Sequence, residues 1–385
     1  MNEALALRRI FIEGVQGLLN PPRNNIANLD VLRSLAILLV FGGHFAGEFG
    51  APARMKTFPM VYFGWTGVDL FFVLSGLLIG MQLWKELQKT GRIRIPTFLL
   101  RRGLRIWPLY YSFVLLILAE GLLIHRNLSG VWSDVLFLSN YFHHQIGGGW
   151  SLSTEEQFYI SIPILMLLLS RMAKLRHGWM LPVAWLTLLP VIRALTLRGS
   201  SANSAFRSDV FSPIHTHSDG LAFGVLLAWF VIVGPGILQM RTALKVLCAV
   251  LMIALAVGLY SLSRDIFNFT SLALIYGAAT FYGVGLISSS AVLNWRGFYI
   301  ISRLSYGVYL NHFGLLPIVV RWLSPLRAHG YLSFCIAYLL TFLFCLATAA
   351  LTFLLIEWPF LWLRSRWLAA PKHARPATAL PVGAP

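Results

Sequence analysis

The sequence has little charge, few acidic residues and almost no cysteine. Charged residues make up only 12% of the 385 residues, against roughly 25% in soluble domains, so a soluble globular protein is excluded. Acidic residues are scarcer than basic ones, with 14 Asp and Glu against 31 Lys and Arg. The three cysteines lie in apolar runs without metal-ligand spacing, which excludes a disulfide-stapled fold and a cysteine-ligated metal.

Apolar residues dominate what is present. They make up 57% of the chain, and the mean hydropathy of +0.71 excludes disordered and collagen-like proteins. A helix of about 20 apolar residues crosses the hydrocarbon core of a bilayer. We therefore predict an all-α integral membrane protein, a bundle of about ten transmembrane helices. The expected spans are residues 30–49, 62–84, 104–124, 156–170, 179–196, 214–233, 243–261, 267–288, 299–320 and 331–361.

The basic residues give the expected orientation. With a cytoplasmic N-terminus, 21 of the 31 Lys and Arg fall on the inner side and nine on the outer side, which matches the preference of basic residues for cytoplasmic loops. Both termini are thus expected inside. The net charge of +17 comes with no nucleic-acid-binding motif, so we expect the lipid bilayer as a partner and no nucleic acid.

The ends of the chain differ from its middle. Residues 1–27 contain the charged amphipathic stretch LALRRIFIEGVQGLL, which predicts an interfacial helix and not a signal peptide. Residues 28–363 form the expected transmembrane domain. Residues 364–385 are basic and rich in Ala and Pro, which predicts a disordered cytoplasmic tail. The piece 131–142 is expected to be re-entrant or interfacial.

Ionisable residues inside apolar spans are the candidates for function, because each is costly in lipid unless it is paired or faces a watery cavity. In the opening span, Arg33 and His44 are 11 residues apart and share one helix face, separated by roughly 16 Å at about 1.5 Å per residue. Either this face holds a ligand, or Arg33 extends to the headgroups and His44 bonds within the bundle. Asp69 needs a partner from another helix, and Arg33 and His44 are the candidates.

Two further motifs carry polar side chains at helical spacing. Arg102 and Arg105 lie three residues apart at the cytoplasmic face, where they suit forked contacts with phosphate oxygens, although topology alone also favours arginine there. Ser151 and Glu155 are spaced i, i+4 at the start of a span, and capping explains only one of the two acids Glu155 and Glu156. We expect a polar pocket near this segment.

Two histidine-containing segments give weaker signals. His215, His217 and Asp219 cannot converge on one ion from a helix, because residues two apart diverge by about 200°. No metal is therefore expected. Tyr306, Tyr309 and His312 are spaced i, i+3, i+6, so they line one side of a helix, which favours polar core packing as much as substrate contact.

Together these motifs resemble the acyltransferase-3 family of bacterial membrane O-acyltransferases that modify surface sugars. The resemblance covers roughly residues 28–362 and rests on stretches that occur in the family's order, LDVLRSLAILLVFGGHF, GWTGVDLFFVLSGLLIG, FLLRRGLRIWPLYY, WSLSTEEQFYISIPIL, SDGLAFGVLLA, ISRLSYGVYLNHFGLLP and IEWPF. It implies a multi-pass protein of the bacterial cytoplasmic (inner) membrane. This protein would move an acyl group, acetyl by default, from cytoplasmic acyl-CoA to a carbohydrate hydroxyl.

The resemblance also implies roles for single residues. His44 would act as general base or transient acyl carrier, with Asp69 or Glu155 orienting it, and Arg33, Arg102 and Arg105 would bind the donor. Supporting roles fall to Asp30, Ser75, Ser151, Glu156, Tyr159, Asp219, Tyr309 and His312. No permanently bound cofactor and no metal are expected, since acyl-CoA is a substrate.

The sequence departs from the family pattern at three positions. Val31 replaces a usual Gly, His217 stands where many members carry Arg, and Asn311 stands where many carry Trp. His217 would make one expected positive charge depend on pH. The esterase-like domain of some relatives is not expected here, so the chain would act alone or with a separate partner. The alternative function is a transporter or flippase that uses the intramembrane Asp, Arg and His without covalent chemistry.

Overall fold

The computed structural model describes residues 2–22, 25–52, 55–172, 174–198, 208–234, 236, 239–285 and 294–367, and in these residues every regular element is a helix. The long helices are α1 (Asn2–Leu19), α2 (Ala27–Phe49), α4 (Gly67–Thr90), α5 (Ile95–Leu123), α7 (Gly149–Met172), α8 (Met180–Arg198), α10 (Asp219–Ile232), α11 (Thr242–Leu262), α12 (Arg264–Gly285), α13 (Arg296–Trp322), α14 (Gly330–Thr352) and α15 (Trp358–Trp367). Short helices are α3 (Pro59–Tyr62), α6 (Val131–Val135) and α9 (Ser208–Phe211), and a π-helical turn (Phe353–Glu357) joins α14 to α15.

Each of the ten expected spans corresponds to a helix, the tenth being α14, the π-helical turn and α15 together. Among the described residues, six segments are long and apolar enough to cross a membrane by themselves, namely 27–49, 64–90, 95–123, 175–198, 242–262 and 330–367. The all-α, multi-pass membrane architecture is thus confirmed. Helices α7, α10, α12 and α13 are shorter or more polar, so the count of ten crossings and the side of the termini stay predictions.

Small residues let the central helices approach closely. At Gly76 of α4, a Cβ atom would lie 2.2 Å from the carbonyl oxygen of Leu221 on α10, and at Gly224 of α10 it would lie 2.3 Å from that of Val73. Such close backbone contact is typical of helix packing in membranes, where no hydrophobic force drives association. Gly76 and Gly224 are therefore packing residues that fix α4 against α10.

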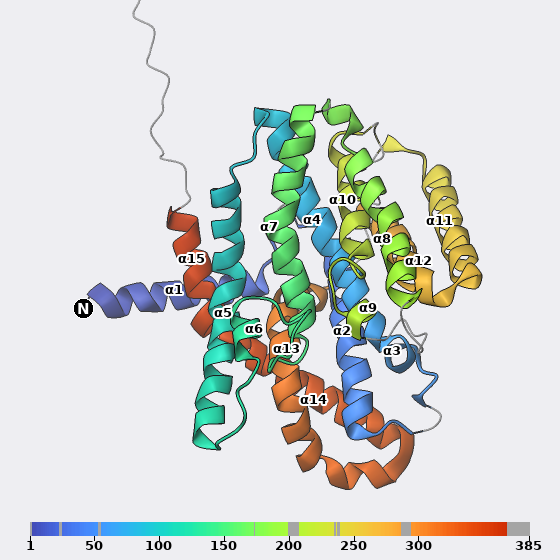
Figure 1. The fold of residues 1–385 in the computed structure, drawn as a ribbon. Coiled ribbons are helices and arrows are strands. Elements are labelled where there is room, and N and C mark those ends of the chain that lie inside the picture. Colours follow the sequence, from blue (N-terminus) through green and yellow to red (C-terminus); the bar gives the residue numbers. More distant parts are fainter. Residues whose placement is uncertain are drawn as a thin grey trace, which may run out of the picture.

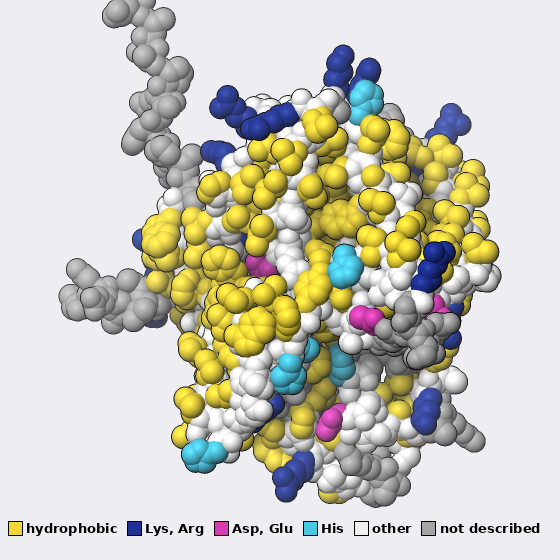
Figure 2. All heavy atoms as spheres, in the orientation of Figure 1, with side chains coloured by type: hydrophobic (Ala, Val, Ile, Leu, Met, Phe, Trp, Pro, Cys, Tyr) yellow, Lys and Arg dark blue, Asp and Glu magenta, His cyan; other side chains and the backbone are white. Residues whose placement is uncertain are grey.

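The periphery of the bundle is apolar. In Figure 1, α11 lies at one edge of the molecule and packs against α12, and its outward side chains such as Leu251 and Val257 are exposed. Figure 2 shows hydrophobic side chains over the middle of the visible face, with Lys and Arg mostly towards its edges. This distribution suits a protein surrounded by lipid.

The N-terminal helix lies across the bundle rather than within it (Figure 1). Gly14 and Gly17 of α1 pack against the indole of Trp358, which donates a hydrogen bond of 2.8 Å to the carbonyl of Ile10. Phe11 remains half exposed. Residues 2–19 thus form the separate helix that the amphipathic pattern predicts.

The C-terminal boundary differs in part from the expected one at residue 364. Arg364 belongs to α15, which continues to Trp367, because the indole of Trp362 bonds to Glu13 and the carbonyl of Arg101 lies beside the Arg364 guanidinium. The expected disordered tail otherwise lies outside the described residues. Residues 131–142 form α6 and a partly buried loop, in which Asp134 accepts hydrogen bonds from Ser139 and from the backbone of Gln145.

Candidate active site

A cavity of about 130 Å³ opens between α2, α4, α5, α7, α13 and the π-helical turn. Its apolar wall comes mainly from α4, where Phe71, Leu74 and Leu78 face inwards, and from Phe353 of the π-helical turn. Its polar lining consists of Arg33, Ser75, Arg102, Arg105, Ser151, Glu155, Tyr159, Arg303, Ser305, Tyr306, Tyr309 and Glu357. All three of the expected donor-binding arginines therefore face one space.

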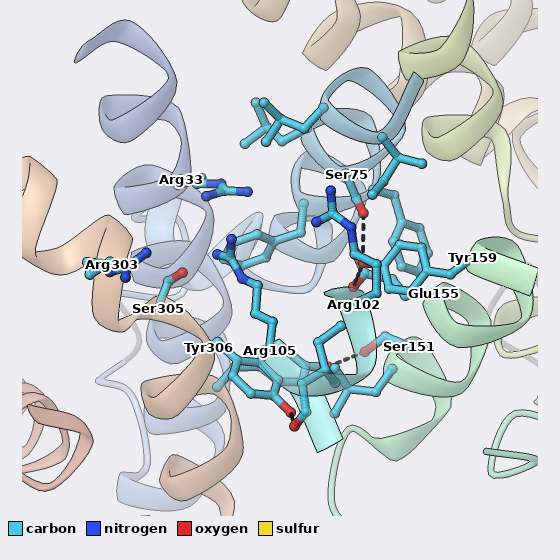
Figure 3. Close-up of a pocket in the computed structure, with 18 of the residues that line it drawn as sticks. Arg33, Ser75, Arg102, Arg105, Ser151, Glu155, Tyr159, Arg303, Ser305 and Tyr306 are labelled. Carbon is cyan, nitrogen blue, oxygen red and sulfur yellow. Dashed lines mark hydrogen bonds between the residues drawn. The ribbon is translucent and has the colours of Figure 1, made fainter. Parts of the chain in front are cut away.

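Four arginines from three helices give this cavity a strong positive charge. Figure 3 shows Arg33 of α2 and Arg303 of α13 on one side and Arg102 of α5 on the other, with Arg105 between them. Arg102 donates a hydrogen bond of 2.8 Å to Gln82 and lies over the ring of Tyr159. Two acids, Glu155 and Glu357, also line the cavity. The excess of guanidinium groups favours an anionic ligand.

One face of α7 carries the remaining expected polar residues. Ser151, Glu155 and Tyr159 all line the cavity, as the i, i+4 spacing predicts. The Tyr159 hydroxyl donates a hydrogen bond of 2.8 Å to Glu155 and lies 3.1 Å from the Ser75 hydroxyl (Figure 3). Glu156, one residue later, is buried but is not among the cavity residues, because adjacent residues on a helix point in directions about 100° apart.

A second, more open cavity of about 480 Å³ adjoins the first one. It shares Arg102 and Arg105 with the first cavity and adds Gln82, Arg101, Arg364 and Ser365. Its residues come from α4, α5 and α15, from the parts of these helices that we expect to face the cytoplasm. The two arginines of the Arg102–Arg105 pair thus stand where a basic entrance meets an apolar interior.

Tyr309 of α13 also lines the first cavity. The Tyr309 hydroxyl lies 2.5 Å from the Ser151 hydroxyl and donates a hydrogen bond of 3.2 Å to the carbonyl of Gly148. Gly148 has a φ of +71°, and a Cβ atom there would lie 2.8 Å from the Tyr309 hydroxyl. Tyr306 and Tyr309 face one side of α13, as their spacing predicts.

His44 is not among the residues that line either cavity. We expected Asp69 or Glu155 to orient it, but the structure gives that contact to His312, whose Nε2 lies 3.1 Å from Nδ1 of His44. The reason lies in the helix packing, since α2 packs against α13 and brings His312 to His44. The His44 side chain is exposed, whereas His312 is completely buried.

Asp69 has a different partner from the two expected. Its Oδ1 lies 2.9 Å from Nε2 of His217, whose Nδ1 lies 2.6 Å from the carbonyl oxygen of Phe211. The His217 ring stacks on Phe269 at 3.6 Å. The expectation that Asp69 pairs with Arg33 or His44 is wrong, because the first turn of α4 packs against the start of α10.

Asp30 and Asp219, which we expected to support the site, connect helices. Asp30 accepts a hydrogen bond of 2.7 Å from Ser302, which ties the start of α2 to α13 beside Arg303. Asp219 forms a completely buried, bidentate ion pair with Arg193 of α8, at 2.7 and 3.0 Å. Asp219 is thus paired with a guanidinium from α8.

Sequence reasoning missed Arg303 and Glu357 as cavity residues. Both residues lie in expected spans, Arg303 in 299–320 and Glu357 in 331–361. The Arg303 guanidinium lies over Phe353 at 5.1 Å, and its Nε and the Glu357 Oε1 are buried without a hydrogen-bond partner in the part of the chain that the structure describes. Their position within otherwise apolar runs was the signal that could have found them.

No group of three or more His, Cys, Asp or Glu side chains converges to hold a metal ion among the residues that the structure describes. His215, the residue that began the weak histidine cluster, instead lies 2.9 Å from the Tyr141 hydroxyl through its Nδ1. Its ring stacks on the Tyr141 ring. The three residues of that cluster therefore have three separate partners.

Comparisons with known proteins give the same family as the motifs. An acyltransferase domain model matches residues 26–355. A Staphylococcus aureus (strain COL) protein named "Putative O-acetyltransferase" is 27% identical over 53% of this chain and 34% of its own length. The peptidoglycan O-acetyltransferase OatA of Listeria monocytogenes is 28% identical over 40% of this chain and 26% of its own length.

The matched region is therefore about a third or less of each of these relatives. No solved structure matches the chain. The domain match, in contrast, covers most of the sequence and includes every residue of the cavity lining except Glu357 and Leu361. The chain therefore belongs to this family of membrane acyltransferases.

Proposed function

We propose that the protein transfers an acetyl group from acetyl-CoA, entering from the cytoplasmic side, to a hydroxyl group of a cell-wall or surface carbohydrate on the outer side. The arginine-lined cavity between α2, α5 and α13 is the observation that carries the proposal. The donor ends in phosphate groups, and forked guanidinium groups suit phosphate oxygens. The peptidoglycan O-acetyltransferase among the relatives supports a carbohydrate acceptor.

The two adjoining cavities support one arrangement of acetyl-CoA in the site. The open entrance with Arg101, Arg102, Arg105 and Arg364 would hold the nucleotide phosphates. The narrower interior, with apolar walls and Arg33 and Arg303, would hold the pantetheine arm. The thioester would then point towards Tyr309 and His44, at the far end from the entrance.

His44 is the proposed base. Its imidazole would take the proton of the acceptor hydroxyl as the oxygen attacks the thioester carbon; a C–O bond forms and the C–S bond breaks. The leaving CoA thiolate then receives that proton, so the products are the acetyl ester and CoA. In the second possible route His44 itself carries the acetyl group between donor and acceptor.

The test uses membranes that contain the protein, radiolabelled acetyl-CoA and purified peptidoglycan. Wild type should form a labelled ester. His44→Ala should lose about 10²–10⁴-fold in rate, the usual contribution of a general base. Arg102→Ala should raise the acetyl-CoA KM, because it removes a cavity guanidinium.

Two exposed residues supply matched controls. Arg92→Ala removes the same charge from the same cytoplasmic segment outside both cavities, and His143→Ala removes a histidine from a loop away from the cavities. Both should act like wild type. If His44→Ala labels the acceptor as well as wild type does, the role of His44 is wrong. If wild type labels none of the carbohydrate acceptors while a solute crosses the membrane, the transporter function replaces this one.

A further inference from the structure

We propose that His312 is a positioning residue that holds His44 in the tautomer with the proton on Nδ1, so that the bare Nε2 of His44 performs the chemistry. The effect of this tautomer on catalysis rests on the proposed function. The position of the proton on His44 is argued from the hydrogen bonds alone.

The argument starts at the buried end of the pair. Nδ1 of His312 lies 3.0 Å from the carbonyl oxygen of Val308, one turn earlier on α13. A carbonyl oxygen only accepts hydrogen bonds, so Nδ1 of His312 must carry a proton and donate it. In a neutral imidazole the other nitrogen is then an acceptor. Nε2 of His312 therefore offers a lone pair.

This lone pair faces His44. Nε2 of His312 lies 3.1 Å from Nδ1 of His44, and a hydrogen bond between two nitrogens needs one proton between them. Because His312 accepts, Nδ1 of His44 donates. The arrangement resembles the general case in which a base is held in one tautomer by a third group that bonds to its other nitrogen.

A charged His312 would reverse this assignment, and the surroundings disfavour it. The side chain has no solvent exposure, and it bonds to the carbonyl of Val308 and to the imidazole of His44, neither of which is an anion. A buried cation without a paired anion is strongly unfavourable. Aromatic rings of Phe41, Tyr309 and Phe313 lie around His312, at centroid distances of 6.3, 5.8 and 4.1 Å. We therefore assign His312 as neutral.

This tautomer determines what the Nε2 of His44 can do. The His44 side chain is exposed, and with the proton on Nδ1 its Nε2 carries a lone pair. A lone pair there can remove a proton from an acceptor hydroxyl or attack the thioester carbon. Both routes of the proposed reaction need that lone pair, and neither can use an Nε2 that carries a proton.

The backbone around His312 is fixed well enough to hold this geometry. The neighbouring Asn311 is buried and donates a hydrogen bond of 2.9 Å to the carbonyl of Cys345, which ties α13 to α14. The His44 ring also packs against Phe313, at 4.6 Å between centroids. The two imidazoles thus meet between helices whose relative position is set by other contacts.

The first measurement is nitrogen-15 NMR of histidine-labelled protein in lipid bilayers at pH 8, where an ordinary imidazole with a pKa near 6.5 is neutral. The His44 signals are identified by their loss in His44→Ala. We expect a protonated Nδ1 and an unprotonated Nε2. A protonated Nε2 on His44 overturns the proposal, and this result does not depend on any enzymatic activity.

The second measurement compares two amide variants. In His312→Gln the amide oxygen reaches the position of Nε2 and can still accept from His44, whereas in His312→Asn the shorter amide reaches only towards Val308. We expect His312→Gln to keep kcat within about threefold of wild type and His312→Asn to lose at least about tenfold, with the acetyl-CoA KM unchanged in both.

The outcomes separate this proposal from the proposed function. Equal kcat values for His312→Asn and His312→Gln, or an equal loss in both, show that His312 does not act through His44. Both variants should elute as monodisperse protein, which removes misfolding as the cause of the difference. If wild-type membranes form no ester, the proposed function fails, and the NMR spectrum still decides the tautomer.

Discussion

Removing the guanidinium of Arg193 should destabilise the protein far more than removing any arginine of the cavity. Arg193 has no solvent exposure, and its three nitrogens donate five hydrogen bonds, of 2.6 to 3.0 Å. Two of these bonds reach Asp219, and the others reach the carbonyls of Ile266 and Thr216 and the Thr270 hydroxyl. Arg193→Met fills a similar volume but leaves the carboxylate of Asp219 buried without its cation.

Breaking one partner of such a pair costs about 3–5 kcal/mol, whereas removing both charges costs much less. The free energy of unfolding, measured by detergent titration in mixed micelles, should therefore fall by about 3–5 kcal/mol in Arg193→Met. Asp219→Asn in the same chain should recover part of that loss. Arg198→Met, an exposed change at the end of the same helix, should stay within about 0.5 kcal/mol of wild type.

The reasoning is refuted if Arg193→Met unfolds with the same free energy as Arg198→Met. It is also refuted if the effects of the two substitutions on the free energy of unfolding simply add. In that case Asp219→Asn lowers the free energy of Arg193→Met by as much as it lowers that of wild type, and the two residues are independent. Either result would mean that the guanidinium and the carboxylate do not form the pair that joins α8 to α10.

Two further predictions concern packing and the donor site. Gly76→Ala should lower the free energy of unfolding by about 1–3 kcal/mol, because its Cβ would lie 2.2 Å from the carbonyl of Leu221. The matched control in the detergent titration is Gly47→Ala, whose Cβ would have no atom within 4 Å. Arg303→Met should raise the acetyl-CoA KM in the membrane assay about 10–100-fold, because it removes one hydrogen bond to a charged group. Arg321 is exposed and lies later on the same helix, so Arg321→Met should leave KM unchanged. An unchanged KM in Arg303→Met would remove Arg303 from the donor site.

Contacts within one helix could be predicted from the sequence. The period of the helix alone puts Ser151, Glu155 and Tyr159 on one face, and all three line the cavity. The same period brings Tyr306 and Tyr309 to the cavity side of α13. The ten apolar runs likewise predict the ten helical segments, because the length of a helix that crosses lipid is set by the bilayer.

Contacts between helices could not be predicted in this way. The cost of burying a charge shows that Asp69 needs a partner, but not that the partner is His217, since the choice depends on which helices pack together. The same limit applies to His44, whose partner His312 lies 268 residues away. Glu357 escaped notice for a different reason. It ends a π-helical turn, and such turns are rare and change the direction of the side chains that follow.

Helix α13 connects the two ends of the proposed reaction. Arg303, Tyr306 and Tyr309 line the donor cavity, and His312, one turn later, contacts His44 outside it. The Tyr309 hydroxyl is bonded to Ser151 and Gly148. In the proposed reaction the thioester has to extend beyond the cavity lining to meet the Nε2 of His44, because His44 is not a lining residue. The single-face arrangement of Arg33 and His44 on α2 therefore does not by itself place both residues in one cavity, since Arg33 lines it and His44 does not.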